Sequence, residues 1–210
     1  MKKLSIISIL VLVFSVGSVF GQCFPDHCSQ CVATMPNAGN EEMVLFVLPD
    51  GSGSPFSEAQ TRYDGDFLDA HIELRVLDAY GTPVPNYPME DMWLESTGGG
   101  MVSCSGGTCA DVNTDQNGLT LWETPLHAGG FSDSSLQVVV NGFPLNMGPF
   151  PMAIVSADMN GDGAVNLSDI GYFSSLFFNE YAFEADLFAD GVLNLADVGR
   201  LALGKGATCP

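Results

Sequence analysis

A run of oxygen-bearing side chains near the C-terminus is the part of the sequence with the clearest chemistry. Residues 158–169 place Asp or Asn at positions 1, 3, 5, 9 and 12 of a twelve-residue segment, with Gly163 at position 6. Ca²⁺ is a hard cation that takes six to eight oxygen ligands, and an EF-hand-type loop supplies them from these positions and from the carbonyl of position 7. The sequence therefore predicts a Ca²⁺ site formed by Asp158, Asn160, Asp162, Ala164, Asn166 and Asp169.

The same pattern returns 28 residues later, in residues 186–197. Positions 1, 5, 6, 9 and 12 keep their residue types, but position 3 is Phe188, which cannot bind a cation through its side chain. An internal repeat indicates that both segments are built in the same way. We predict a second and weaker Ca²⁺ site formed by Asp186, Asp190, Val192, Asn194 and Asp197, with Val192 contributing its backbone carbonyl.

Two features distinguish these segments from an ordinary EF-hand. Position 12 is Asp in both loops instead of the longer Glu, and three prolines between residues 144 and 151 prevent a helix from leading into the first loop. Tandem loops that keep only an exit helix, with Asp at position 12, resemble the dockerin family over residues 156–207. The resemblance implies two calcium loops, two roughly antiparallel helices and calcium-dependent binding to a cohesin module on another protein.

Apolar residues after each loop follow a helical spacing. Ile170, Phe173 and Phe177 share one stripe of the first helix, and Val198 and Leu201 are their counterparts in the second, so we expect them to form a small core between the helices. Three further side chains are expected to pack on the rest of the chain or on a partner: Leu176, Phe178 and Phe188. Loop positions 10 and 11, which carry partner specificity in the best-known dockerins and are often Ser-Thr there, are Leu-Ser and Leu-Ala here. The alternative is that both loops only staple a small C-terminal unit through calcium.

The N-terminus has the pattern of an export signal. Lys2 and Lys3 precede an apolar run from Leu4 to Phe20, and the small residue Gly21 follows. We therefore predict that residues 1–21 are a secretory signal peptide and that the protein is secreted or held at the cell surface. The alternative is that the same residues remain as an uncleaved membrane anchor. No other stretch of the sequence is long and apolar enough to span a bilayer.

Charge limits the class of partner. The formal net charge is −19, and removal of Lys2 and Lys3 lowers it by two to −21. Such a surface repels nucleic acids and anionic membranes. We expect no nucleic-acid partner and no stable membrane insertion after signal cleavage.

All six cysteines follow the predicted signal peptide, which favours disulfides. Cys104 and Cys109 flank a flexible Ser-Gly-Gly-Thr loop, so we predict that these two pair. Cys209 would then tie the C-terminus to a Cys-containing N-terminal segment, residues 22–41. The alternative for that segment is a zinc site with the ligands Cys23, Cys28, Cys31 and His27.

Between these regions the sequence favours short strands separated by turns rich in Gly, Pro and Asn. Residues 67–77 alternate strictly, with one apolar face formed by Leu68, Ala70, Ile72, Leu74 and Val76. Other strands are expected at residues 43–48, 89–95, 101–104, 119–122 and 136–140. The absence of a helical period in this region indicates an all-β sandwich.

Two turns carry a second resemblance. The segments Asp78 to Val84 (DAYGTPV) and Thr114 to Gly118 (TDQNG), followed by the strand at 136–140, resemble bacterial Ig-like domains of the invasin type. The resemblance implies an Ig-like β-sandwich over residues 42–150, a module that serves as a spacer, an adhesive surface or a docking platform. A linker at 151–155 would join it to the repeats at 156–207, so the whole fold is expected to be mainly β, with a small two-helix calcium-binding dockerin-like module.

Nothing in the sequence forms a catalytic set. His71 alternates onto the polar face of a strand, His127 lies in a Gly-rich loop, and none of the usual hydrolase or phosphate-binding motifs occurs. We predict a secreted, non-catalytic protein whose dockerin-like module mediates calcium-dependent docking of the Ig-like domain to a cohesin-bearing scaffold or cell-surface protein. The alternatives are a self-contained surface or adhesive protein stapled by calcium, and a polysaccharide-binding accessory of a carbohydrate-degrading system. For the last, exposed aromatic side chains would stack on sugars: Phe67, Tyr80, Tyr87, Trp93 and Trp122.

Overall fold

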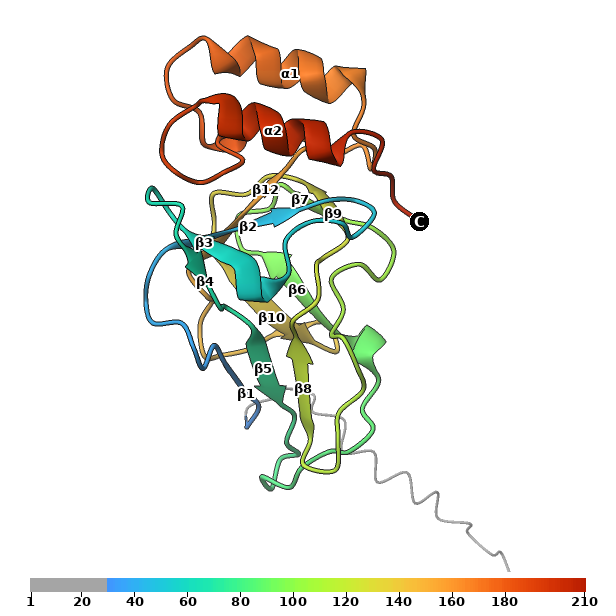
Figure 1. Cartoon of the computed structure of the whole chain (residues 1–210). Coiled ribbons are helices and arrows are strands. Elements are labelled where there is room, and N and C mark those ends of the chain that lie inside the picture. The colour runs from blue at the N-terminus through green and yellow to red at the C-terminus, as the bar shows by residue number, and fades with distance from the viewer. Residues whose placement is uncertain (1–29) are drawn as a thin grey trace, which may run out of the picture.

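A computed structural model describes residues 30–210 of the chain (Figure 1). The predicted signal peptide and three of the four ligands of the alternative zinc site, Cys23, His27 and Cys28, lie outside these residues. The strands are β1 (Val32–Thr34), β2 (Met43–Val47), β3 (Ala59–Thr61), β4 (Phe67–Leu68), β5 (Ile72–Arg75), β6 (Met92–Ser96), β7 (Met101–Ser103), β8 (Leu119–Trp122), β9 (Ala128–Gly130), β10 (Leu136–Val140), β11 (Phe143–Pro144) and β12 (Met152–Ser156). The α-helices are α1 (Leu167–Phe177) and α2 (Leu195–Gly204), and the 3-10 helices are Phe56–Glu58, Met89–Asp91 and Phe183–Ala185.

The strands pack as a β-sandwich around one hydrophobic core. Two antiparallel sheets have the orders β1-β5-β8 and β11-β10-β6. A third, mixed sheet has the order β12-β2-β3-β4, in which β12 runs parallel to β2. β7 pairs with β9 at the end of the sandwich that faces the helices (Figure 1). Side chains from all three larger sheets meet in the core, including Ile72, Leu94, Trp122, Leu136 and Ile154. The mainly β prediction is thus confirmed.

The alternating strand prediction is confirmed for most of its length. Ala70, Ile72, Leu74 and Val76 are wholly buried in the core. Leu68 is only half-buried, because β4 pairs with β3 whereas β5 pairs with β1 and β8. The chain crosses from one sheet to another at residues 69–71, which a period of two alone does not reveal.

The predicted linker at residues 151–155 is wrong. Residues 152–156 form strand β12, whose five residues are all buried and pair in parallel with β2. The prolines before it end at Pro151, and Met152 to Val155 is a continuous apolar run, the composition of a strand covered on both faces. The C-terminal repeats are therefore connected to the sandwich by a sheet strand.

The two helices form a layer over one end of the sandwich, side by side and running in opposite directions (Figure 1). Their inner side chains share a second hydrophobic core with the outer face of β2 and β12, which contributes Val44, Phe46, Ala153 and Val155, and with Leu48, which follows β2. Phe173 and Leu201, expected to pack only between the helices, are buried in this shared core. In the described part of the chain, neither helix is long and apolar enough to cross a membrane.

The predicted pairing of Cys104 with Cys109 is also wrong. Cys104 forms a disulfide with Cys209, with the Cα atoms 5.5 Å apart, and Cys109 is a free, partly exposed thiol. The C-terminal tail runs beside the first repeat loop, which rests on β7 and β9, so Cys209 meets Cys104 at the end of β7. Cys209 therefore does not tie the C-terminus to the N-terminal segment, although Cys31 of that segment is disulfide-bonded.

Candidate metal centre

Helix caps position two of the ligands predicted in each loop. Asn166 is the N-cap of α1, and its side chain accepts a hydrogen bond from the backbone N–H of Ser168 at 2.8 Å. Asp169, three residues later, accepts from the N–H of Asn166 at 2.8 Å. Asn194 and Asp197 form the same capping box at α2. Loop positions 9 and 12 are thus fixed by the requirement to satisfy free N–H groups at a helix start.

Oxygen atoms from positions 5 and 7 converge on a single point in both loops. The side-chain amide of Asn166 donates to the carboxylate of Asp162 at 3.4 Å and to the carbonyl of Ala164 at 3.0 Å. In the second loop the amide of Asn194 donates to Asp190 at 2.9 Å and to the carbonyl of Val192 at 3.2 Å. These acceptors are the predicted Ca²⁺ ligands. In each loop the side-chain NH₂ group of Asn166 or Asn194, which carries partial positive charge, lies between them.

Four of the predicted ligand carboxylates are inaccessible to solvent. Asp158, Asp169 and Asp197 are 0% exposed and Asp186 is 2% exposed. The described residues contain four ion pairs, made by Arg62 and His71, and none involves these carboxylates. Buried carboxylates are normally paired with a cation or bound to a metal.

The electrostatics of the loops reflect this missing charge. Burial raises the pKa of Asp158, and the nearby carboxylates of Asp169 and Asp162 add to the effect. Burial also raises the pKa of Asp186 and of Asp197, with repulsion from Asp190 contributing to both. A bound cation would remove the repulsion in each loop and replace the lost hydration.

One carboxylate oxygen in the second loop has no partner at all. Oδ2 of Asp186 accepts from the N–H of Gly191 and from the hydroxyl of Tyr181, each at 2.9 Å, whereas the buried Oδ1 lacks any hydrogen bond. Within residues 30–210, no three His, Cys, Asp or Glu side chains cluster closely enough to form a metal site by themselves. The three Asp side chains of each predicted donor set are therefore not gathered closely enough in this structure to bind a metal ion by themselves.

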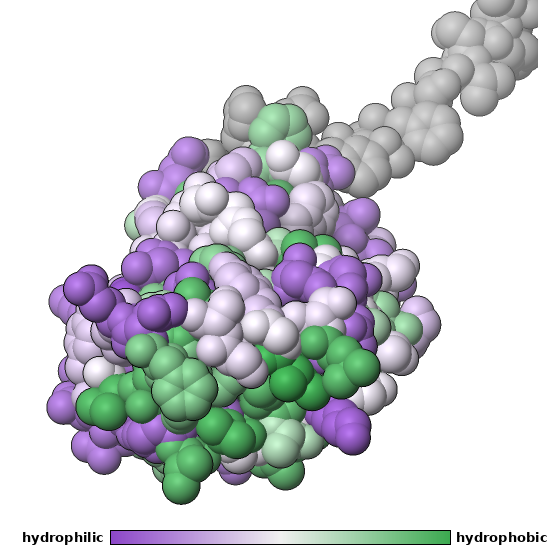
Figure 2. All heavy atoms as spheres, turned by 90° about the horizontal axis from the view of Figure 1, so that it is seen from above, coloured by the Kyte–Doolittle hydropathy of each residue, from purple (hydrophilic) through white to green (hydrophobic). Residues whose placement is uncertain are grey.

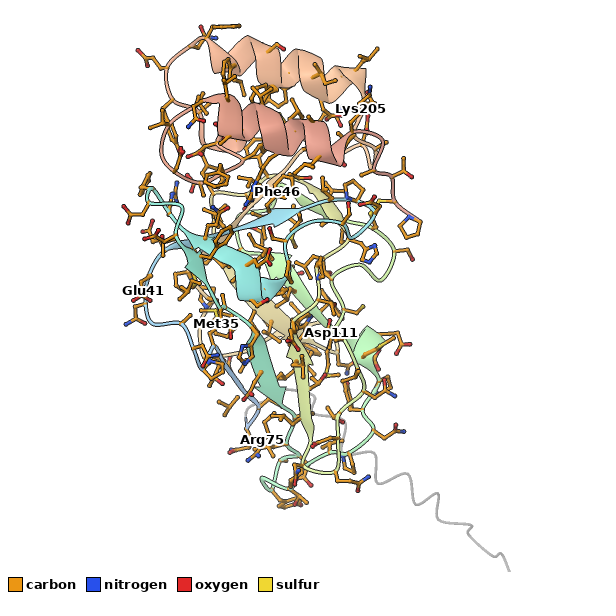
Figure 3. The ribbon with its side chains drawn as sticks, in the orientation of Figure 1. Met35, Glu41, Phe46, Arg75, Asp111 and Lys205 are labelled. Atoms are coloured by element: carbon orange, nitrogen blue, oxygen red, sulfur yellow. A yellow bond between two sulfur atoms is a disulfide. The ribbon has the colours of Figure 1, made fainter. Side chains whose placement is uncertain are left out.

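The second loop uses position 3 for packing. Phe188 stacks on the guanidinium of Arg200, whose carbon lies 5.0 Å from the ring centroid, and Phe46 stacks on Arg200 at 5.0 Å as well. Figure 3 shows Phe46 at the boundary between the strands and the helix layer. Arg200 also donates to the carbonyl of Leu187 at 3.2 Å, and burial lowers the pKa of its guanidinium. The sequence offered no signal for this contact, because Arg200 stands where the first repeat has Tyr172.

Both loops rest on the sandwich. The N–H of Gly130 donates to the carbonyl of Asp158 at 2.6 Å, and a methyl group added to Gly129 would lie 2.6 Å from Cγ of Asp158. In the second loop the N–H of Tyr63 donates to the carbonyl of Ala189 at 2.9 Å. The sequence does not indicate the close approach of β9 to Asp158, because the Gly-rich segment around Gly129 predicts only a loop.

The helix layer carries exposed apolar side chains. Leu167 and Leu195, which occupy position 10 of the two loops, are 82% and 81% exposed. Leu203 and Phe178 are exposed to a similar degree. Figure 2, which looks down on the helix layer, shows hydrophobic side chains gathered over it.

Other residues singled out from the sequence lie apart from the two loops. His71 lies just before β5, where Nδ1 is 2.8 Å from Oδ1 of Asp69. Of the aromatic residues considered for sugar binding, Trp122 and Tyr87 are buried, whereas Phe67 and Tyr80 are exposed. The described residues therefore do not bring this aromatic set together on the surface.

Comparisons with known proteins add little. No protein-family model matches the chain, and no curated protein matches it. Among solved structures, the chain is similar to the Lin-41 filamin domain at 17% sequence identity and a TM-score of 0.28, over 60% of this chain and 93% of that domain. A likeness this weak says nothing about function, so the description of the fold rests on the sheet topology above.

Proposed function

We propose that loops 158–169 and 186–197 each bind one Ca²⁺ ion, and that the ions hold the helix layer in place as a calcium-dependent docking surface. The observation that carries the proposal is the burial of four loop carboxylates, none of which forms an ion pair within residues 30–210. The first ion would be held by Asp158, Asn160, Asp162, Asn166, Asp169 and the Ala164 carbonyl. The second would be held by Asp186, Asp190, Asn194, Asp197 and the Val192 carbonyl.

The metal supplies positive charge that neither loop obtains from its own residues. The free Oδ1 of Asp186 offers an unused acceptor for it in the second loop. In each loop the ion would replace the position-9 amide N–H group that now bridges the acceptors of positions 5 and 7. Binding and folding are coupled, because mutually repelling carboxylates are held together only while the ion is present.

The proposed docking depends on two exposed leucines of the helix layer. Leu167 and Leu195 occupy equivalent positions of the two repeats and are both solvent-exposed. Exposed apolar side chains grouped on one face are typical of protein interaction sites. Together with the dockerin resemblance, they support a cohesin-type module on a scaffold or cell-surface protein as the partner of an exported, non-catalytic Ig-like domain.

A capture experiment tests docking. The chain from residue 22 to 210 serves as bait for a panel of purified cohesin modules, with Ca²⁺ and with a chelator. We expect capture by at least one module only with Ca²⁺, and loss of capture in the double variant Leu167→Asp, Leu195→Asp. The matched control is Tyr80→Ser, which changes a side chain that is 88% exposed in a turn of the sandwich. Absence of capture with Ca²⁺, or capture unaffected by the double variant, refutes docking through this face.

The shared core favours a second candidate function. Phe173 and Leu201 are buried against β2 and β12, so calcium also acts as an internal staple of a self-contained surface protein. This function needs no partner, and it predicts that the double leucine variant keeps full calcium binding and stability. Calcium titration and thermal unfolding of that variant separate the staple from the docking surface.

A further inference from the structure

We propose that the C-terminal tail, residues 206–209, is a structural part of the first calcium loop, and that the Cys104–Cys209 disulfide sets the affinity of that loop for Ca²⁺. The inference rests on the calcium binding proposed above and adds a redox control that acts on one loop only.

The tail pairs with the loop through backbone hydrogen bonds on both sides of a predicted ligand. The N–H of Cys209 donates to the carbonyl of Gly163 at 2.9 Å, and the N–H of Val165 donates to the carbonyl of Ala207 at 2.9 Å. The N–H of Gly206 donates to the carbonyl of Val165 at 3.0 Å, and Ala164 forms an antiparallel bridge with Thr208. Loop positions 6 to 8 are therefore held as a short strand, which fixes the direction of the Ala164 carbonyl.

The disulfide is what anchors this short strand. Cys104 is buried, and its N–H donates to the carbonyl of His127 at 2.9 Å, so its backbone is fixed in the sandwich. Only Ala207 of the tail residues is buried, which leaves little apolar contact to hold the tail once the disulfide opens.

The second loop has no equivalent support. Leu193, at position 8 of that loop, makes no backbone hydrogen bond to another segment within residues 30–210. Its loop instead contacts the sandwich through Tyr63 and Ala189, far from either cysteine in sequence. Opening the disulfide should therefore weaken the first site and leave the second unchanged.

The redox step is an ordinary thiol–disulfide exchange. A dithiol reductant supplies two electrons and two protons, the Cys104–Cys209 bond becomes two thiols, and the reductant becomes a cyclic disulfide. Linkage between sites is reciprocal, so if the disulfide raises calcium affinity, calcium must make the disulfide harder to reduce by the same factor. If the protein is exported, the first site would reach its full calcium affinity only after the Cys104–Cys209 bond has formed, outside the reducing cytosol.

Calcium titration of full-length chains tests the inference loop by loop. Asp190→Ala leaves the first loop as the principal site, and Asp162→Ala leaves the second. We expect Cys209→Ser to weaken calcium binding at least tenfold in the Asp190→Ala background and less than twofold in the Asp162→Ala background. Cys109→Ser is the matched control, because Cys109 is a free thiol close to Cys104 in sequence, and it should change neither affinity.

The reduction potential of the unsubstituted chain provides a second measurement that does not depend on the folding of a variant. We expect saturating Ca²⁺ to lower the midpoint potential of Cys104–Cys209 by about 30 mV for each tenfold difference in affinity. Equal affinity with and without the disulfide, or a potential unaffected by Ca²⁺, overturns the role of the tail. Failure of every form to bind Ca²⁺ is a different result, which refutes the proposed calcium binding itself and the redox control with it.

Discussion

A methyl group on Gly129 should displace the first carboxylate of the first calcium loop. In Gly129→Ala the new carbon would lie 2.6 Å from Cγ of Asp158, whereas carbon atoms pack at about 3.5–4.0 Å. The carboxylate must therefore move by about 1 Å. Calcium–oxygen bonds span only about 2.3–2.6 Å, so a shift of this size removes Asp158 from the ligand set.

The expected cost follows from the loss of one charged ligand. Interactions with a charged group contribute about 1.5–3 kcal/mol each, which corresponds to roughly 10-fold to 150-fold weaker calcium binding. Crowding at β9 should also lower the free energy of unfolding by about 1–3 kcal/mol in the absence of Ca²⁺. Isothermal titration in the Asp190→Ala background measures the first effect, and thermal unfolding in chelator measures the second.

The control for this substitution is another glycine-to-alanine change. A methyl group on Gly171, in α1, meets nothing within 4 Å, so Gly171→Ala should leave calcium binding unchanged. It should also stabilise the helix by about 0.5–1 kcal/mol. If Gly129→Ala binds Ca²⁺ within threefold of its parent, then Asp158 is not a ligand or β9 does not fix its position, and the reasoning fails.

Three further predictions concern the two loops. Asp162→Ala should reduce total calcium binding more than Asp190→Ala, because the second loop already lacks a ligand at position 3; equal effects in a titration would contradict this ranking. Phe188→Asp should strengthen calcium binding by the second loop about tenfold, if a restored ligand contributes as much as other charge-assisted contacts, and should lower the stability of the metal-free chain, because the stacking on Arg200 is lost; unchanged affinity would show that position 3 cannot reach the ion. Chelation should lower the unfolding temperature of helices and sandwich together, since calcium at a thousandfold excess over Kd stabilises by about 4 kcal/mol per site and the two parts share a core. Far-ultraviolet circular dichroism and the fluorescence of Trp93 and Trp122, both in strands of the sandwich, should then report one transition, and two separate transitions would instead indicate independent domains.

The last expectation differs from what the repeats suggest when considered alone. A module of loop and exit helix covering residues 156–207 predicts that chelation unfolds the repeats while the sandwich survives. The burial of Val44, Phe46 and Val155 beneath the helices makes that separation unfavourable, because unfolding the helices would expose the outer face of β2 and β12. The proposed bait for docking is accordingly the chain from residue 22 onward and not the repeats in isolation.

Local features were predictable from the sequence, and contacts between distant segments were not. The predicted ligands of each loop lie within twelve residues, and their capping boxes depend on residues three apart, so Asn166, Asp169 and their counterparts read directly as a pattern. The inward face of β5 follows from a period of two, which a single strand determines alone.

Disulfide pairing and the attachment of the repeats depend on the arrangement of whole elements. Cys104 and Cys109 are five residues apart and joined by a flexible loop, yet Cys104 bonds to Cys209, which lies 105 residues away, because the tail runs beside the first loop. The run Met152 to Val155 follows three closely spaced prolines, which draw attention to a linker and away from a strand. Neither distance along the chain nor local propensity contains this information.

The parallel pairing of β12 with β2 has a mechanical consequence. A partner that pulls on the helix layer would load β12 along its length, so five residue pairs with β2 would be sheared together instead of being unzipped one at a time. The C-terminal tail, which runs beside the first loop, is tied to the residue after β7 by the covalent bond between Cys104 and Cys209. Tension would therefore enter the sandwich at two points, one resisted by a row of hydrogen bonds and the other by a covalent bond.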